Sequence, residues 1–70
     1  MLNKTLLEKK LKESGYRLQF VASKLGLTYA GLQRKIKGIT DFKLDESYVL
    51  AELLEMDDAD ILAVFFAKKS

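Results

Sequence analysis

Apolar side chains recur along this chain at intervals of three and four residues, the spacing that places them on one face of an α-helix. Three pairs stand four residues apart, and each lies in a segment whose remaining positions are largely polar: Leu7 and Leu11, Val21 and Leu25, Leu32 and Ile36. This helical pattern is not interrupted by proline, which the chain lacks. The pattern therefore predicts an all-α protein, a compact bundle of about five short helices.

The residues that begin and end helices divide the pattern into five segments, at about 3–14, 18–25, 29–37, 44–55 and 58–67. Side chains suited to cap a helix N-terminus precede three of them: Asn3 or Thr5, Thr28, and Asp57. Gly15 and Gly38 follow helices one and three, where glycine adopts the left-handed conformation that ends a helix. We expect Phe42, in the loop 39–43, to be anchored in the core. The chain is then a single domain over residues 1–70.

Apolar side chains of the fourth segment suit the core, whereas those of the fifth segment allow two interpretations. Leu50, Leu53 and Leu54 are expected on the buried face of the fourth helix, and the acids Asp45 and Glu46 favour its first turn. The fifth carries a stripe of four apolar residues, Ile61, Leu62, Phe65 and Phe66. Either Leu62 and one of the two phenylalanines complete the core, or the stripe is a surface for a protein partner, since aromatic anchors supply much of the energy at interfaces.

Charge is divided unevenly between the two halves of the chain, although its total is only +2. Residues 1–43 contain ten Lys or Arg and three acids, a net charge of +7. Residues 44–70 contain two Lys and seven acids, a net charge of −5. The basic half suits a polyanion, and the acidic half suits solvent or a basic partner protein.

The composition narrows the chemistry further. Cysteine and histidine are both absent, which removes disulfides, thiolate metal sites and the commonest general base. The acids at 57, 58 and 60 lack the glycine and terminal glutamate of a calcium loop. We therefore expect no enzyme activity, no cofactor and no metal. No apolar run approaches the ~18 residues of a membrane span, so a soluble cytoplasmic protein is expected.

Residues 21–38 are the part of the chain that points to a function. Gly26 separates two short helical segments, and Ala22 is a small residue that would let two helices cross closely. This spacing is typical of a helix-turn-helix, here at about residues 18–38, whose second helix enters the major groove of DNA. With Leu32 and Ile36 facing the core, the second helix presents a polar outward face: Tyr29, Ala30, Gln33, Arg34 and Lys37.

Each outward position has a chemistry suited to DNA. Arg34 can donate two hydrogen bonds to guanine or bind a phosphate, and Gln33 or Tyr29 can meet adenine or a phosphate. Ala30 can lie against a thymine methyl group, and Thr28 places a hydroxyl at a helix N-terminus, which favours phosphate. The expected backbone contacts are the lysines around this helix: Lys24, Lys35, Lys37 and Lys43. The alternative is that these lysines form an ordinary solvated face.

A family resemblance is carried by residues 15–38, which read GYRLQFVASKLGLTYAGLQRKIKG. They resemble the helix-turn-helix of the phage repressor and Cro superfamily, with Ala22, Gly26, Leu32 and Ile36 at the structural positions of the motif. The resemblance implies a lambda-repressor-like DNA-binding domain and DNA contacts from Tyr29, Ala30, Arg34 and Lys37. The superfamily's phosphate-binding glutamine at the start of helix two is Leu18 here.

Across its length the chain is similar to the modulator-of-repression family of lactococcal temperate phages. That similarity implies a regulator of the lysis–lysogeny switch which opposes the lysogeny repressor, either at operator DNA or as an anti-repressor that binds the repressor itself. A homodimer is also possible. The candidate partner surface combines the acidic set, the apolar stripe and one aromatic of the recognition helix: Glu52, Glu55, Asp57, Asp58, Asp60, Ile61, Leu62, Phe65, Phe66 and Tyr29. The alternative for the acids is helix capping and solubility.

Overall fold

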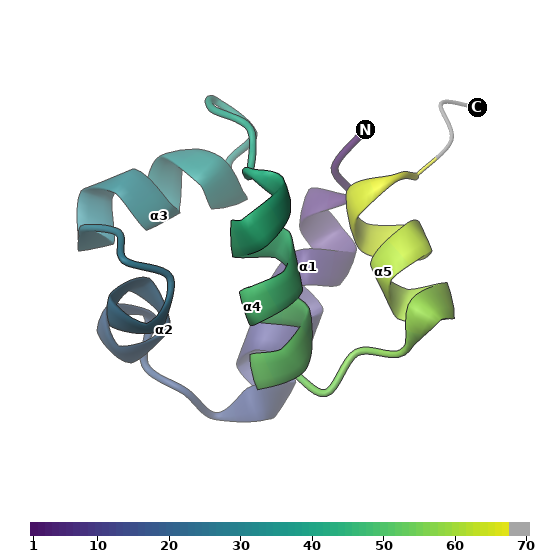
Figure 1. Cartoon of the computed structure of the whole chain (residues 1–70), viewed down its shortest axis with the longest axis horizontal. Coiled ribbons are helices and arrows are strands. Elements are labelled where there is room, and N and C mark those ends of the chain that lie inside the picture. The colour runs from purple at the N-terminus through teal and green to yellow at the C-terminus, as the bar shows by residue number, and fades with distance from the viewer. Residues whose placement is uncertain (68–70) are drawn as a thin grey trace.

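The computed structural model describes residues 1–67, and these form five α-helices joined by short turns (Figure 1). The helices are α1 (Lys4–Ser14), α2 (Leu18–Lys24), α3 (Tyr29–Ile36), α4 (Leu44–Leu53) and α5 (Asp58–Phe65). The all-α bundle expected from the apolar periodicity is therefore confirmed. In Figure 1, α2 and α3 lie on one side of the molecule, α5 lies on the other, and α4 passes in front of α1.

The helix termini follow the capping chemistry of the sequence. Asn3 caps α1 by accepting a hydrogen bond from the backbone N–H of Leu6 at 3.1 Å, so Asn3 rather than Thr5 is the cap. Asp57 caps α5 by accepting from the N–H of Asp60 at 2.8 Å. Gly15 follows α1 with a φ of 75°, the left-handed conformation that ends the helix.

Helices α4 and α5 each end two residues before the predicted position. Leu54 is the C-cap of α4, and Glu55 then takes a φ of 53°, which is uncommon for a residue with a side chain. This turn brings the N–H of Met56 to the carbonyl of Ala51 at 2.8 Å. Helix α5 ends at Phe65, and the N–H of Ala67 instead donates to the carbonyl of Met1 at 2.9 Å.

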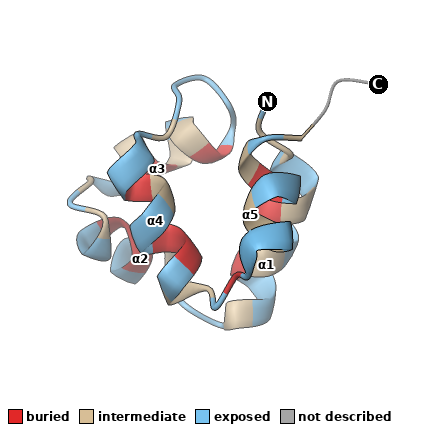
Figure 2. Cartoon of the chain, turned by 45° about the vertical axis from the view of Figure 1, so that its right-hand side comes forward, coloured by how far each residue is buried: buried red, intermediate tan, exposed pale blue. Residues whose placement is uncertain are grey.

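All five helices contribute to one core, visible as red segments facing the interior in Figure 2. Its largest fully buried side chains are Leu7, Leu32, Leu50, Val21 and Val64. Ala22 is also buried, as expected of the small residue at the contact between α2 and α3. Phe42 is half-buried, packs against the core and lies edge-on to Phe65 with ring centroids 5.5 Å apart, so its predicted anchoring is confirmed.

The apolar stripe of α5 does not pack as one unit. Ile61 and Phe65 are half-buried against the core, whereas Leu62 is 60% exposed and Phe66 is 58% exposed. The expectation that Leu62 completes the core is therefore wrong. Val64 takes that place, because it lies three residues after Ile61 on the inner face of α5.

Candidate nucleic-acid interface

Helices α2 and α3 pack against each other across the four-residue turn 25–28 (Figure 1). Gly26 has a φ of 70°, and the N–H of Leu27 returns to the carbonyl of Ala22 at 2.9 Å. The turn therefore closes on the last residues of α2 and fixes the direction in which α3 leaves. Arg17, at the start of α2, makes no side-chain capping bond.

Thr28 begins α3 with the capping bond that the sequence predicts. Its hydroxyl oxygen accepts from the N–H of Gly31 at 3.0 Å, and its own side chain remains exposed to solvent. Gly31 leaves just enough room for this bond, since a Cβ at that position would lie 3.1 Å from the Thr28 hydroxyl. The first turn of α3 is thus a rigid, solvent-facing helix N-terminus.

Four of the five residues predicted to face outward from α3 are exposed in the structure, and the fifth, Gln33, is half-buried. Leu32 is fully buried and Ile36 is 7% exposed, and these two side chains pack one face of α3 against the core. Ala30 and Arg34 lie on the opposite side of the helix and are exposed. Tyr29, three residues before Leu32 and so at the flank of the buried face, is exposed as well. A helix that is anchored along one side and polar along the other can lay its free side in a groove about as wide as the major groove of B-DNA, roughly 12 Å.

Two of these side chains are joined to each other. The amide nitrogen of Gln33 donates to the hydroxyl oxygen of Tyr29 at 2.7 Å. The pair stands one helical turn apart, which is the spacing at which side chains on a helix meet. Together they form a polar pair at the flank of α3, in which Tyr29 is exposed and Gln33 is half-buried.

Not every predicted phosphate contact has a free ammonium group. Lys37 and Lys43 are exposed, and the ammonium of Lys24 lies 5.4 Å above the ring of Phe20. Lys35 instead points inward, with a side chain only 12% exposed. Its Nζ lies 2.8 Å from Oε1 of Glu46 and 2.9 Å from the carbonyl oxygen of Asp41.

Lys35 is therefore not available as a phosphate contact, although the sequence predicted it as one. Its ammonium is occupied by two acceptors, and moving it outward would leave Glu46, itself 7% exposed, with an unpaired charge. Lys35 is a structural residue that joins α3 to α4. Glu46 lies in the first turn of α4, as the sequence predicts, and this bond gives it a second role as the partner of Lys35.

The sequence contained a signal for this ion pair. Glu46 stands four residues before the fully buried Leu50, so the two share one face of α4. Lys35 stands three residues after Leu32, at the edge of the buried face of α3. Burial penalises the charge of Glu46, but the hydrogen bonds from Lys35 and from the Lys43 N–H, together with both lysine charges, outweigh it and lower its pKa.

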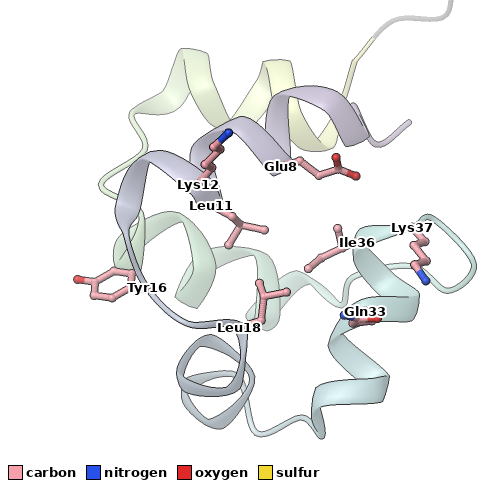
Figure 3. A pocket seen from close by; sticks show the side chains of 8 residues that line it. All are labelled: Glu8, Leu11, Lys12, Tyr16, Leu18, Gln33, Ile36 and Lys37. Carbon is pink, nitrogen blue, oxygen red and sulfur yellow. The ribbon is translucent and has the colours of Figure 1, made fainter.

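A shallow pocket of about 370 Å³ lies beside the candidate interface, between α1 and α3 (Figure 3). Leu11, Leu18 and Ile36 provide apolar walls. The remaining lining residues are four polar side chains and one aromatic: Glu8, Lys12, Gln33, Lys37 and Tyr16. Leu18, the first residue of α2, is half-buried and packs against the core, so it makes no polar contact there.

The acidic residues of the C-terminal half fall into two groups. Asp57 and Asp60 cap α5 reciprocally, and Asp60 also pairs with Lys10 of α1 at 3.2 Å. The backbone N–H of Asp57 and the ammonium of Lys10 lower the pKa of Asp60. Glu52, Glu55 and Asp58 are exposed. Only these three, of the five acids in the candidate partner surface, are without a capping or ion-pairing role in the part of the chain described.

Comparison with known proteins gives no relative: no family model matches the chain, and no curated protein or solved structure does either. In the described residues 1–67, no helix has both the length and the apolar character needed to cross a membrane. No three acidic side chains within that range gather as a group that could hold a metal ion.

Proposed function

We propose that this chain is a helix-turn-helix domain that binds duplex DNA through the exposed face of α3. One observation carries the proposal: α3 is anchored by Leu32 and Ile36 and turns Tyr29, Ala30 and Arg34 to solvent. The capped N-terminus at Thr28 and the exposed Lys37 supply phosphate contacts beside that face. The net charge of +7 over residues 1–43 favours the same partner.

The resemblance of residues 15–38 to the phage repressor and Cro superfamily extends this proposal to a biological role. On that basis the chain is a small transcription regulator of a phage lysis–lysogeny switch, opposes the lysogeny repressor and acts at operator DNA in the cytoplasm of the bacterial host. Arg34 is the residue that we assign to base or phosphate recognition, because its guanidinium presents a fork of donors on the exposed face.

The test begins with selection of bound sequences from a random duplex library. The recovered duplex is then labelled and titrated by fluorescence anisotropy against a scrambled duplex of the same composition. Arg34→Ala should weaken binding to the selected duplex by about 1–3 kcal/mol, a rise in Kd of roughly 5- to 150-fold. Lys9→Ala removes the same charge from the exposed face of α1 and is the matched control, with little change in Kd expected.

Two results would distinguish sequence-specific recognition from DNA binding in general. Equal affinity for the selected and scrambled duplexes would remove sequence-specific recognition and leave general DNA binding. Failure to recover any bound duplex at low salt would remove DNA binding altogether.

A second candidate, an anti-repressor that binds the repressor protein, is favoured by the exposed apolar side chains. Tyr29 is 46% exposed on the same face of α3, and Leu62 and Phe66 are more than half exposed on α5. Aromatic side chains in such positions are typical anchors of protein interfaces. This candidate predicts a stable complex with the lysogeny repressor that is weakened by Tyr29→Ala or Phe66→Ala. Failure of the two proteins to co-purify at micromolar concentration would count against it.

A further inference from the structure

The loop between α3 and α4 is held closed by backbone hydrogen bonds and by the side chains of Lys35, which is largely buried, and Glu46, which is buried. On the backbone, the N–H of Ile39 donates to the carbonyl of Arg34 at 2.9 Å, and the N–H of Gly38 donates to that of Lys35 at 3.1 Å. Lys35 Nζ then reaches across the loop to the carbonyl of Asp41. Backbone bonds therefore tie the start of the loop to the last turn of α3, and the Lys35 side chain ties Asp41, further along, to the same turn.

Glu46 holds the other half of the loop. Its Oε1 accepts from Lys35 Nζ at 2.8 Å and from the backbone N–H of Lys43 at 2.8 Å. One carboxylate oxygen thus joins the last turn of α3, the end of the loop and the first turn of α4. The exposed cations Lys37 and Lys43 stand at the two ends of the loop 37–43 that this arrangement closes.

Stability alone is a weak reason for such a pair. Desolvating two charges offsets most of their attraction, so replacing a buried ion pair by neutral side chains of similar size often leaves stability unchanged or raised. Directional hydrogen bonds fix the distances between three backbone segments more precisely than apolar packing does: the last turn of α3, the loop, and the first turn of α4. The segments fixed here are those that carry Arg34, Lys37 and Lys43.

We infer that Lys35 and Glu46 are positioning residues that hold Lys37 and Lys43 in register with the exposed face of α3, so that these cations meet DNA phosphates together with Arg34. This inference rests on the proposed function, since its ligand is the backbone of the duplex that α3 reads. Lys35 and Glu46 touch no phosphate in this arrangement. They act through the loop.

The test compares two charge-neutral double variants with the wild-type chain in the anisotropy titration, repeated over a range of salt concentrations. Lys35→Met with Glu46→Gln removes the ion pair but keeps an amide oxygen for the Lys43 N–H. Lys10→Met with Asp60→Asn is the matched control, because it removes the α1–α5 ion pair and leaves the net charge at +2. Thermal unfolding followed by circular dichroism is used to choose a temperature at which all three proteins are folded.

The first variant should bind the selected duplex at least ten times more weakly than the wild type. Its log–log salt slope should also fall by about 0.9 for each phosphate contact that is lost. Such a change in slope distinguishes positioning from a general loss of stability. Hydrogen exchange at the Ile39 amide should become faster in this variant, and the control should match the wild type in affinity, slope and exchange.

Wild-type affinity and slope in a folded first variant would overturn the inference and leave the proposed function standing. If the wild-type chain itself fails to bind any duplex, the proposed function is overturned and this inference falls with it. Should the first variant lose its helical signal, Lys35→Leu with Glu46→Leu replaces it, because an apolar pair of similar size keeps the core filled. The affinity and the salt slope of that apolar variant then test the inference in the same way.

Discussion

Replacing Lys35 alone by methionine is the most informative perturbation of this fold. The substitution keeps the length and apolar stem of the side chain but removes the ammonium that pairs with Glu46 at 2.8 Å. Glu46 is 7% exposed, so water can solvate its carboxylate only poorly. Once the Lys35 ammonium is removed, the Lys43 N–H is the hydrogen-bond donor that remains to this carboxylate in the described structure. The variant therefore places an uncompensated charge at the junction of α3 and α4.

The expected loss of stability follows from that burial. Removing one partner of a fully buried ion pair costs about 3–5 kcal/mol. Here the two side chains are 12% and 8% exposed and one donor remains, so we expect a loss of about 2–3 kcal/mol near neutral pH. A chain of this length has a total stability of roughly 4–10 kcal/mol. The melting temperature should fall by about 8–24 °C.

The pH dependence of this loss has a definite sign. In the wild-type protein the pKa of Glu46 is below its usual value of 4.5, so its contribution is complete above that value and disappears as the pH falls through the lowered pKa. In the variant, burial without Lys35 raises the same pKa, so the folded state is relieved by protonation. The difference in stability between the two proteins should therefore shrink as the pH falls from neutral toward about 4.5.

Urea unfolding followed by circular dichroism measures both quantities. The lowered pKa of Asp60 contributes to acid sensitivity in both proteins and cancels in their difference. Glu46→Gln in the Lys35→Met background should recover most of the lost stability, because it removes the stranded charge. A loss below about 0.5 kcal/mol, within the range of an ordinary surface substitution, or one that is the same at both ends of this pH range, would refute the reasoning.

Two further predictions concern the geometry that presents α3. Gly26→Ala should destabilise the fold by about 1–2 kcal/mol through backbone conformation alone, because φ is 70° there and an added Cβ would meet nothing within 4 Å; urea unfolding measures it, and an unchanged midpoint would contradict it. Leu32→Ala should cost about 2–5 kcal/mol, since Leu32 is fully buried; a melting temperature within about 4 °C of the wild type would show that the core tolerates the cavity.

The helices were predictable from the sequence because their boundaries depend on local chemistry. Asn3, Thr28 and Asp57 each accept the capping bond that their side chains predict, and Gly15 ends α1 in the left-handed conformation. The ends of α4 and α5 were less predictable. Glu55 adopts a left-handed φ without being glycine, and the backbone bond from the Met56 N–H to the Ala51 carbonyl accompanies it.

The candidate site was predictable in its exposed face but not in its internal bonds. The spacing of Leu32 and Ile36 places Ala30 and Arg34 outward, and the structure has both exposed, together with Tyr29 at the flank of the buried face. Whether Lys35 faces solvent or a buried carboxylate depends on how α4 crosses α3, which is a tertiary property. The periodicity of α4 places Glu46 on the face of Leu50 but does not name its partner.

NMR can locate the DNA-binding surface that we propose on the exposed face of α3. A ¹⁵N-labelled sample of the wild-type chain is titrated with the selected duplex, and the change in each amide resonance is mapped onto the five helices. We expect the largest changes on residues 28–37 and the adjoining loop, and no shift of the α5 amides. Changes concentrated on α5, or none at all at saturating duplex, would contradict the proposal.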